Sequence, residues 1–536
     1  MHEIASLVFY DEGVIGCCGA HWLNFISKRL VAPGAGVSLA QGDDQCGNLR
    51  EIRAGANSNE KPAQSLQMSD FYHSFQDGSD VCWLDAKKSS GSTVSHGTSV
   101  RFLKRAFYFR LLAVVCMITG LGVFAGLAGC GATIALIPSP PVQASTVSPI
   151  PGSPIQHIVI IMQENRSFDN LFNGFPGADT VRIGVSNGVS APLKPVPLGD
   201  SRDLIHSHKQ WWHDWDNGRM DGFAQDGSML PYSYVPESDV EPYWTIAREF
   251  VLGDRMFQSN TGPSFVAHQY LIAGQSGNVA ENPTGSVWGC DADPGTTAAL
   301  VGPNGTELPG VFPCFDYQTT ADLLDEKGIT WRYYAPADGD SFYVLSAYQA
   351  IRHIRFGNDW NDNVISPQNR VLTDIEHGEL AQVTWIVPDY AHSDHPGSGT
   401  EGPDWVASIV NAIGKSQFWN STAIFVTWDD WGGWYDHVDP PKVDAMGPGF
   451  RVPLLIVSPY ARHGYISHHF HEASGFIAFI EHNFDLGTLG ARDAGTDAYL
   501  DCFDYTQKPE PLTPIPTKVT IDKLLREKDS GPPDDD

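Results

Sequence analysis

Basic residues are scarce in this 536-residue chain. It has 34 Lys and Arg against 63 Asp and Glu, so its formal net charge at pH 7 is −29. Binding to a nucleic-acid backbone needs a positively charged face, so we expect no nucleic acid among the partners. The same balance argues against an anionic membrane surface as a partner, unless a covalent lipid supplies the affinity.

Charged residues of both signs are also few. They make up 18% of the chain, whereas hydrophobic residues reach 42% and aromatic residues 11%. A chain with this much apolar material is globular, which excludes disorder of the whole chain. The chain is longer than one ordinary core needs, so we expect two or three domains, or one large α/β domain with appendages.

Cysteine is scarce after residue 130. Six of the nine cysteines lie at or before that position, and the others are Cys290, Cys314 and Cys502. Cys290 and Cys314 flank a Gly- and Pro-rich loop at 291–313, so a disulfide between them is expected in an oxidising compartment. Cys502 would then be unpaired, and no cysteine spacing indicates a zinc finger.

One long uncharged run bears on targeting. Residues 101–110 contain three arginines and one lysine, and no charge occurs from Leu111 to Gly129. This order is typical of a secretory signal, and its length also suits a membrane anchor. Leu127–Cys130 (LAGC) resembles a bacterial lipobox, which predicts a signal peptide over residues 100–130 and a lipid on Cys130. We therefore expect an exported, periplasmic or cell-surface protein that this lipid holds at the membrane. A plain cleaved signal and a retained anchor are the alternatives.

The segments around this run are predicted to lack a fold of their own. Residues 1–99 show no sustained helical or strand periodicity, and we interpret them as a mis-annotated or disordered extension, with translation beginning near Val100. Residues 131–154, rich in Pro and Ser, are predicted to be a flexible tether. Residues 508–536 are predicted to be a Pro-rich and acidic tail.

Residues 155–507 are predicted to form one large catalytic domain. Short apolar runs at 155–162, 382–387, 422–427 and 452–458 alternate with stretches of helical pattern, among them 320–327, 404–413 and 472–482. This pattern predicts an α/β fold with a mostly parallel central sheet and helices on both faces. Ligands of such sheets bind beyond the carboxyl ends of the strands.

Acidic and amide side chains follow two of these runs. Glu164 and Asn165 come after the first, and Asp429 and Asp430 come after the third. Adjacent carboxylates in a buried cleft repel each other unless a cation neutralises them. Such oxygen ligands suit one divalent metal ion, and Mg, Ca, Mn, Fe and Zn all stay open. Helix capping or turn formation is the alternative for these acids, above all for Asp436.

Several motifs of residues 155–484 resemble, in order, one known family. They are IVIIMQENRSFDNLFNGFPG from Ile158, MDGF at 220–223, SNTGPSFVAHQYLIAG at 259–274, SDHPGSG at 393–399, TWDDWGGWYDHV at 427–438 and VPLLIVSPYAR at 452–462. They resemble the phosphoesterase family of bacterial acid phosphatases and phosphatidylcholine-type phospholipases C, a relative of the alkaline phosphatase superfamily. The resemblance implies an alkaline phosphatase-like fold and a phosphate ester substrate.

The resemblance also implies residue roles. The positions that match the family's metal ligands are Glu164, Asn165, Asp429, Asp430 and Ser264. The positions that match the histidines around the phosphate are His206, His353 and His395. Ser264 also matches the nucleophile, which is Ser in the acid phosphatase-like members and Thr in many phospholipases. No role follows for His469 or His471, because residues 468–474 depart from the family pattern.

General chemistry agrees with these roles. A hydroxyl is a weak nucleophile until a base or a metal activates it, and imidazolium groups can bind phosphoryl oxygens and protonate a leaving oxygen. Ser264 follows the turn Thr261-Gly262-Pro263 and precedes a predicted helix at 265–273, an arrangement that aims groups at an anion. A simple N-cap is the alternative for Ser264, and Thr261 is the second candidate nucleophile.

We therefore expect a metal-dependent, acid phosphatase-like phosphoric ester hydrolase with a phosphoserine intermediate at Ser264. Protonated histidines around the phosphate predict an acid-shifted pH optimum. A phospholipase C that cleaves phosphatidylcholine-type lipids is one alternative, and a non-catalytic surface lipoprotein is another. The G-x-G-x-x-G pattern at 397–402 precedes Pro403, which argues against a dinucleotide site. The cluster of His206, His208 and His213 is expected in exposed loops.

Overall fold

The structure is a computed structural model that describes residues 6–10, 13–18, 67–76, 79–87, 148–302, 305–337, 340–441 and 444–526. The chain divides into two units, residues 1–137 and 138–536. In the first unit, β1 (Ser6–Tyr10) pairs with β2 (Gly13–Cys18), and β3 (Gln67–Gln76) pairs with β4 (Ser79–Lys87), both antiparallel. These two hairpins lie in the stretch where we predicted no strand periodicity. The predicted signal peptide and lipobox at 100–130 lie outside the described residues.

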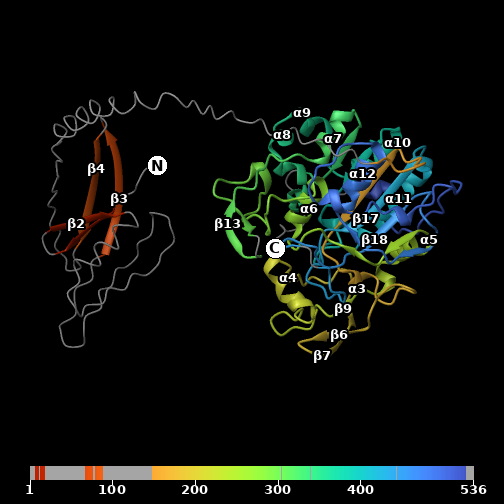
Figure 1. Cartoon of the computed structure of the whole chain (residues 1–536), viewed down its shortest axis with the longest axis horizontal. Helices are drawn as coiled ribbons and strands as arrows, with labels where there is room; N and C mark the ends of the chain where they lie inside the picture. The colour runs from red at the N-terminus through yellow and green to blue at the C-terminus, as the bar shows by residue number, and fades with distance from the viewer. Residues whose placement is uncertain are drawn as a thin grey trace, which may run out of the picture. The chain divides into compact units, whose positions relative to one another are not determined.

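The second unit is built on one eight-stranded sheet (Figure 1). The strand order is β15-β14-β16-β5-β17-β18-β10-β19. The strands are β5 (His157–Gln163), β10 (Val251–Gly253), β14 (Trp331–Tyr334), β15 (Val364–Ile365), β16 (Val383–Ile386), β17 (Thr422–Trp428), β18 (Leu454–Val457) and β19 (Tyr465–Ser467). Only β18 runs antiparallel to its neighbours in this sheet. The prediction of a mostly parallel α/β sheet is thus confirmed, and the four predicted apolar runs form its centre, β16-β5-β17-β18.

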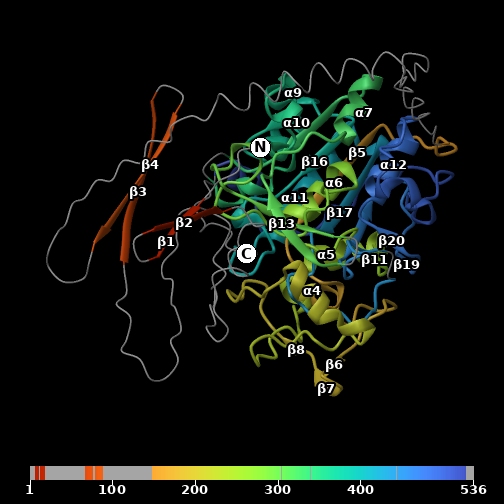
Figure 2. The same ribbon diagram turned by 60° about the vertical axis from the view of Figure 1, so that its left-hand side comes forward.

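Both faces of this sheet are covered. Every residue of β16, β17 and β18 is buried, as is every residue of β5 after the first. Successive side chains of a strand point to opposite faces, so complete burial requires packing on each side. Two groups of helices provide it (Figure 2). One group is α5 (Glu241–Glu249), α10 (Arg370–His377) and α11 (Gly402–Lys415); the other is α6 (Ser264–Ala273), α7 (Thr320–Lys327) and α12 (Gly475–Phe484).

Local sequence signals set the ends of these helices. Helix α7 coincides with the predicted stretch, because Thr319 and Asp322 form a capping box at its start and Gly328 ends it in the left-handed conformation. The shorter helices are α3 (Phe168–Leu171), α4 (His208–Trp215), α8 (Arg352–Arg355), α9 (Asn358–Asn363) and α13 (Ile521–Leu524). The small strand pairs are β6 (Ile183–Ser186) with β7 (Val189–Pro192), β8 (Lys194–Pro195) with β9 (Ser233–Tyr234), β11 (Met256–Phe257) with β20 (His471–Glu472), and β12 (Ala298–Val301) with β13 (Glu307–Val311).

Both ends of the domain extend beyond the predicted boundaries. In the predicted tether, Ile150 is buried and the Ser153 hydroxyl donates to Asn483 Oδ1 at 2.7 Å. In the predicted tail, Ile515 and Leu524 are buried. Apolar side chains inside Pro-rich sequence explain the difference, since their burial outweighs the extended character of the backbone. Residues 148–154 and 508–526 are therefore part of the packed unit.

The cysteines follow the predicted pattern. Cys290 and Cys314 form a disulfide with a Cα–Cα distance of 4.5 Å, which confirms the predicted pairing. Among residues 148–526, where the structure describes the side chains, Cys502 is the free cysteine, and it is buried. Among those same residues, no helix combines the length and apolarity that a membrane crossing requires.

Candidate metal centre

The pairing of β5 with β17 brings the two acidic segments together. The strands are parallel, and Gln163 lies opposite Trp428 at their carboxyl ends. The residues that follow each strand therefore lie side by side, and the Asn165 backbone N–H donates to Asp429 Oδ1 at 2.7 Å. Glu164, Asn165 and Asp429 have no exposed surface. The structure thus brings these two strand ends together, as we expected from the sequence.

An unusual backbone conformation holds the two turns against each other. Asn165 has a φ of 59°, in the left-handed region that asparagine tolerates better than most residues. Gly432, in the turn after Asp430, has a φ of 58°, and a Cβ there would lie 2.2 Å from the Asn165 carbonyl oxygen. Only glycine allows this close approach. Residues held in such conformations concentrate at functional sites.

Ser264 reaches this centre from the start of α6. Its Oγ lies 3.4 Å from Glu164 Oε2 and is fully buried. One turn further along the helix, His268 Nε2 lies 3.1 Å from the other oxygen of the same carboxylate. Burial lowers the pKa of His268 to about 4, so the ring is neutral near pH 7. Sequence reasoning missed His268, although its spacing of four residues from Ser264 places both on one helix face.

The side-chain amide of Asn165 links Asp429 to two of the predicted histidines. One end of the amide lies 3.1 and 3.2 Å from the carboxylate oxygens of Asp429, and the other lies 3.0 Å from His206 Nε2 and 3.1 Å from His395 Nε2. His206 Nδ1 faces the Leu204 carbonyl at 2.6 Å, and His395 Nδ1 faces the Pro396 carbonyl at 2.8 Å. Carbonyl oxygens only accept, so each Nδ1 carries a hydrogen.

This geometry calls for a positive charge beside Asp429. If both rings are neutral, each Nε2 accepts from the Asn165 amide nitrogen, and the amide oxygen must then face the Asp429 carboxylate. A cation between these oxygens would make that arrangement favourable. If no cation is bound, the opposite orientation of the amide satisfies the same contacts, with both rings as imidazolium donors. The donor set fits a metal ion, because single donor atoms of Glu164, His268 and Asp429 lie within 4.8 Å of one another.

Asp430 occupies the rim of this centre. Its Oδ1 accepts from the Gly432 backbone N–H at 2.6 Å, and its Oδ2 lies 4.0 Å from His206 Nε2. The predicted ligands Glu164, Asn165 and Asp429 are thus in mutual contact, whereas Asp430 joins them through His206. The Trp431 ring packs edge-on against the His206 ring with a centroid distance of 6.2 Å.

A buried arginine fixes the loop that carries His395. Arg166 Nε donates to the Asp394 carbonyl at 2.8 Å, and the Asp394 side chain accepts from Tyr243 and from Trp428 Nε1. Burial lowers the pKa of Arg166 to about 10 and raises the pKa of Asp394 to about 6. Arg166 and Asp394 therefore attach the predicted motif at 393–399 to the end of β5.

Two histidines at the start of α4 are buried, contrary to our expectation of an exposed histidine cluster. His206 and His208 are 2% and 1% exposed, whereas the His213 side chain is 63% exposed. His208 Nδ1 lies 2.8 Å from Thr261 Oγ1, and its Nε2 accepts from Trp212 Nε1 at 3.1 Å. These contacts place Thr261, the second candidate nucleophile, against His208.

The structure does not bring His353 into this group. His353 lies on α8, and its two ring nitrogens contact Asp316 at 2.7 Å and Asp322 at 3.0 Å. Its side chain is 37% exposed. Two carboxylates thus satisfy both ring nitrogens, at the start of α7 rather than at the ends of β5 and β17.

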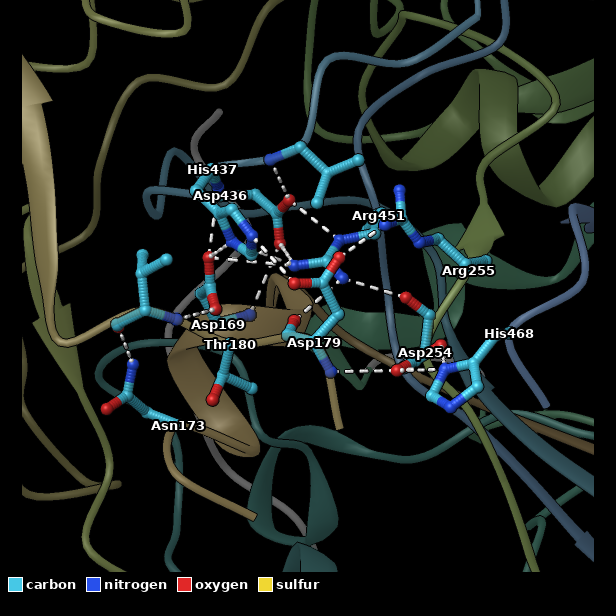
Figure 3. A network of polar contacts seen from close by, with 12 residues as sticks. Asp169, Asn173, Asp179, Thr180, Asp254, Arg255, Asp436, His437, Arg451 and His468 are labelled. Atoms are coloured by element: carbon cyan, nitrogen blue, oxygen red, sulfur yellow. Dashed lines mark hydrogen bonds and ion pairs between the residues drawn. The ribbon is translucent and has the colours of Figure 1, made fainter. Parts of the chain in front are cut away.

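Asp436 has a structural partner, the alternative we left open for it. Arg451, fully buried, donates to both oxygens of Asp436 at 2.8 and 3.1 Å (Figure 3). His437 lies between Asp169 at 2.6 Å and Asp179 at 3.2 Å. Burial opposes the charged form of His437, but its hydrogen bond to Asp169 and the negative charges of Asp169 and Asp436 together outweigh burial and raise its pKa. Arg451 and His437 thus bind these carboxylates and give Asp436 a structural role in the turn.

These observations define a class: an α/β protein whose mostly parallel sheet carries a buried centre of carboxylate, amide, hydroxyl and imidazole groups at the carboxyl ends of its strands. Residues 155–487 match the sequence profile described as the phosphoesterase family. The chain therefore belongs to the phosphoesterase family.

Individual relatives are more distant. The chain is 25% identical over 408 residues to the non-hemolytic phospholipase C of Burkholderia pseudomallei. The aligned region covers 62% of this chain and 55% of that protein. It is 26% identical over 390 residues to phospholipase C A of Mycobacterium tuberculosis. This aligned region covers 60% of this chain and 71% of that protein. The chain thus spans little more than half of the first relative's length. A solved structure from Vibrio parahaemolyticus, described as a protein in the alkaline phosphatase superfamily, has a TM-score of 0.34 and 11% identity, over 67% of this chain and 78% of that one.

Proposed function

We propose that the protein is a metal-dependent phosphoric ester hydrolase that acts on phosphate monoesters through a phosphoserine at Ser264. The observation that carries the proposal is the contact of Ser264 Oγ with Glu164 Oε2 at 3.4 Å, inside the centre formed by the ends of β5 and β17. Membership of the phosphoesterase family supports the reaction class. A non-catalytic binding protein would have no need for a hydroxyl buried among carboxylates.

In this proposal each group has one task. Glu164, Asn165, Asp429, Asp430 and Ser264 hold one divalent ion, and His268 adds a nitrogen donor or orients Glu164. When bound, the ion lowers the pKa of the serine hydroxyl and offsets charge on the phosphoryl oxygens. Ser264 Oγ forms the new bond to phosphorus while the bond to the alcohol oxygen breaks, and that oxygen takes up a proton. Water then cleaves the phosphoserine and releases phosphate.

His206 and His395 are suited to bind the phosphoryl group. Their Nε2 atoms meet at the Asn165 amide, and their ring centroids are 6.5 Å apart. In the protonated form each ring would have to turn its Nε2–H from the Asn165 amide to a phosphoryl oxygen, and from there it would pass a proton to the leaving group. This requirement predicts faster turnover at acidic pH.

Thr261 is the rival nucleophile, and its contact with His208 does not favour it. Trp212 Nε1 can only donate, so His208 Nε2 accepts from it. A neutral His208 ring then carries its hydrogen on Nδ1 and donates to Thr261 Oγ1. His208 in this tautomer cannot take the proton of Thr261, so it does not act as the general base for that hydroxyl.

The test is turnover of p-nitrophenyl phosphate by the full chain and by its Ser264→Ala and Thr261→Ala variants. We expect Ser264→Ala to lose at least about 1,000-fold in kcat, as removal of a nucleophile does, and Thr261→Ala to lose far less. A trapped phosphoserine on the peptide that contains Ser264 would identify the bond formed. Wild-type turnover by Ser264→Ala would refute the proposal.

A phospholipase C is the second candidate, because the curated relatives bear that name. We propose the monoester activity because the family's phospholipases often have Thr where this chain has Ser264. Parallel assays with p-nitrophenyl phosphate and p-nitrophenyl phosphorylcholine, each with and without a chelator, separate the two. Greater kcat/KM for the phosphorylcholine ester would establish the second candidate.

We further propose that the protein is exported and carries a lipid on Cys130. The LAGC sequence at 127–130 supports this proposal, and the disulfide between Cys290 and Cys314 suits an oxidising compartment. Expression with radiolabelled palmitate should label the wild-type chain and leave Cys130→Ala unlabelled. Equal labelling of both, or of neither, would contradict the lipid.

A further inference from the structure

A second group of potential ligands lies away from the centre described above. It consists of His471 on β20 together with Asp501 and Cys502 on a short helical turn, η10 (Leu500–Cys502). His471 has no exposed surface, and neither has Cys502. The phosphoesterase chemistry proposed above uses none of these residues.

The three donor atoms face one another at nearly equal distances. His471 Nε2 is 3.6 Å from Asp501 Oδ1 and 3.9 Å from Cys502 Sγ, and Cys502 Sγ is 3.6 Å from Asp501 Oδ1. Nitrogen, oxygen and sulfur ligands around a tetrahedral zinc ion lie about 3.3–3.6 Å from one another, given metal–ligand bonds of about 2.0–2.3 Å. The spacing in the structure is close to that of such a site.

The hydrogen bonds of His471 direct a lone pair into this group. Its Nδ1 faces Asp497 Oδ2 at 2.8 Å, and because a carboxylate only accepts, Nδ1 carries a hydrogen. In the neutral ring, Nε2 then has a free lone pair. A carboxylate that holds the distal nitrogen in this way is the usual second partner of a zinc-bound histidine.

Ser467 supports the same conclusion. Its Oγ lies 2.9 Å from His471 Nε2 and donates its one hydrogen to Asp501 Oδ2 at 2.6 Å. If the ring is neutral, two lone pairs, on Ser467 Oγ and His471 Nε2, face each other, whereas an imidazolium ring would donate from Nε2 to Ser467 Oγ. A cation bound to both atoms, or to Nε2 and a water, would remove that repulsion.

We propose that His471, Asp501 and Cys502 form a zinc site, with Asp497 as the partner of His471 and Ser467 or water as the fourth ligand. The mixed nitrogen, sulfur and oxygen donors suit zinc better than magnesium or calcium. Asp501 and Asp497 side chains are 21% and 41% exposed, so an ion can enter from the surface.

The site would be structural rather than catalytic. The Arg462 backbone N–H donates to the Cys502 carbonyl at 2.9 Å, beside β19, the edge strand of the central sheet. Bound zinc would fasten the segment that carries Asp501 and Cys502 to this edge. With Ser467 as the fourth ligand, the site has no open position for a substrate.

The test uses cobalt as the probe, because a thiolate ligand gives Co²⁺ a charge-transfer absorption that oxygen and nitrogen ligands do not give. This readout separates the site from the Glu164–Asp429 centre, which has no sulfur donor among its described residues. The full chain, reduced and metal-free, is titrated with Co²⁺ and then with Zn²⁺. We expect one equivalent of thiolate-type absorption, which Zn²⁺ abolishes. No such absorption at saturating Co²⁺ would overturn the proposal.

Matched variants assign the ligands. Cys502→Ser should abolish the absorption, whereas Cys82→Ser should retain it. His471→Gln should weaken Co²⁺ binding at least about tenfold. Asp497→Asn should weaken it about 10- to 100-fold, the range for loss of the carboxylate that holds a metal-bound histidine. His469→Gln should bind Co²⁺ as the wild type does. Far-ultraviolet circular dichroism checks folding, and Asp497→Asn, at a partly exposed position, serves if His471→Gln does not fold. Wild-type absorption in Cys502→Ser would overturn the proposal.

Discussion

The Asn165 amide determines how charge is balanced at the candidate metal centre. Its two ends contact Asp429 on one side and two imidazole rings on the other. A cation beside Asp429 satisfies these four contacts with both rings neutral, and protonation of both rings satisfies them with the amide reversed. The two states differ in their response to metal and to pH, so the question is open to direct measurement.

Replacement of one carboxylate tests the first of these states. Asp429→Asn removes a full negative charge from the proposed ligand set, so we expect Mn²⁺ affinity at least about 10- to 100-fold weaker, with turnover falling in parallel. Isothermal titration calorimetry with Mn²⁺ measures the affinity. Asp439→Asn is the control, since Asp439 is exposed and its Oδ1 accepts from Trp215 at 2.7 Å. Equal affinities in the two variants would show that Asp429 is not a ligand.

His208 predicts an acid sensitivity of folding. Burial lowers its pKa to about 4 from 6.5, so between these values the unfolded chain binds a proton that the native protein does not. Stability is therefore full above pH 6.5 and falls by about 3 kcal/mol as pH drops to about 4. Urea unfolding of His208→Gln at several pH values should show a correspondingly shallower decline. His213→Gln, altered at an exposed ring, should follow wild type; an equal decline in all three proteins would exclude His208 as the cause.

At the scale of elements, the centre depends on strand register. Parallel pairing of β5 and β17 sets Gln163 opposite Trp428, and this register alone brings Glu164 and Asp429 to the same edge. A shift by one residue would turn each buried side chain to the other face of the sheet. The ends of the strands are in turn held by the ion pair between Asp436 and Arg451 (Figure 3).

Loss of that ion pair should destabilise the protein strongly. Arg451→Met leaves Asp436 and Asp169 buried without their arginine, and removal of one partner of a buried pair costs about 3–5 kcal/mol. Arg255→Met is the matched control, because Arg255 pairs with Asp179 while about a third of each side chain is exposed, and such pairs contribute less than about 1 kcal/mol. Equilibrium unfolding in urea measures both. Similar losses would show that burial does not set the strength of these pairs.

The sequence predicted the central strands better than the peripheral ones. The runs that form β5, β16, β17 and β18 are apolar throughout because both faces are covered, and that signal is visible without a structure. The antiparallel direction of β18 was not visible in the sequence, because an antiparallel strand covered on both faces has the same apolar pattern as a parallel one. Strands such as β10 and β19, with three residues each, are too short to show a period.

The limits were similar at the candidate site. Glu164, Asn165 and Asp429 lie together as their positions at strand ends predicted, and Ser264 contacts Glu164 as the family resemblance implied. His268 was missed as a contact of Glu164, and His208 was expected in an exposed loop, because sequence position alone does not tell which side chain a histidine meets in the fold. His353 was predicted from a motif, but its place depends on Asp316 and Asp322, which only the tertiary structure brings to it.

At the scale of the whole molecule, the folded domain extends beyond the C-terminal end of the family match. The match to the phosphoesterase family ends at residue 487, yet the chain packs against the same core well beyond it. Asn411 Nδ2 donates to the Ile515 carbonyl at 2.8 Å, and Asn369 Nδ2 donates to the Leu524 carbonyl at 2.9 Å. These bonds attach residues 508–526 to α11 and to the loop before α10. We infer that this segment belongs to the folded unit and contributes to its stability.

A pair of neighbouring leucines tests this inference. Leu524 is 1% exposed and Leu525 is 44% exposed, so the two truncations differ in burial alone. Leu524→Ala should lower the free energy of unfolding by about 2–5 kcal/mol, because it leaves a cavity in the core. Leu525→Ala should change it by less than about 0.5 kcal/mol, as exposed substitutions do. If Leu524→Ala unfolded at the same urea concentration as wild type, residues 508–526 would be an independent tail, as their composition first predicted.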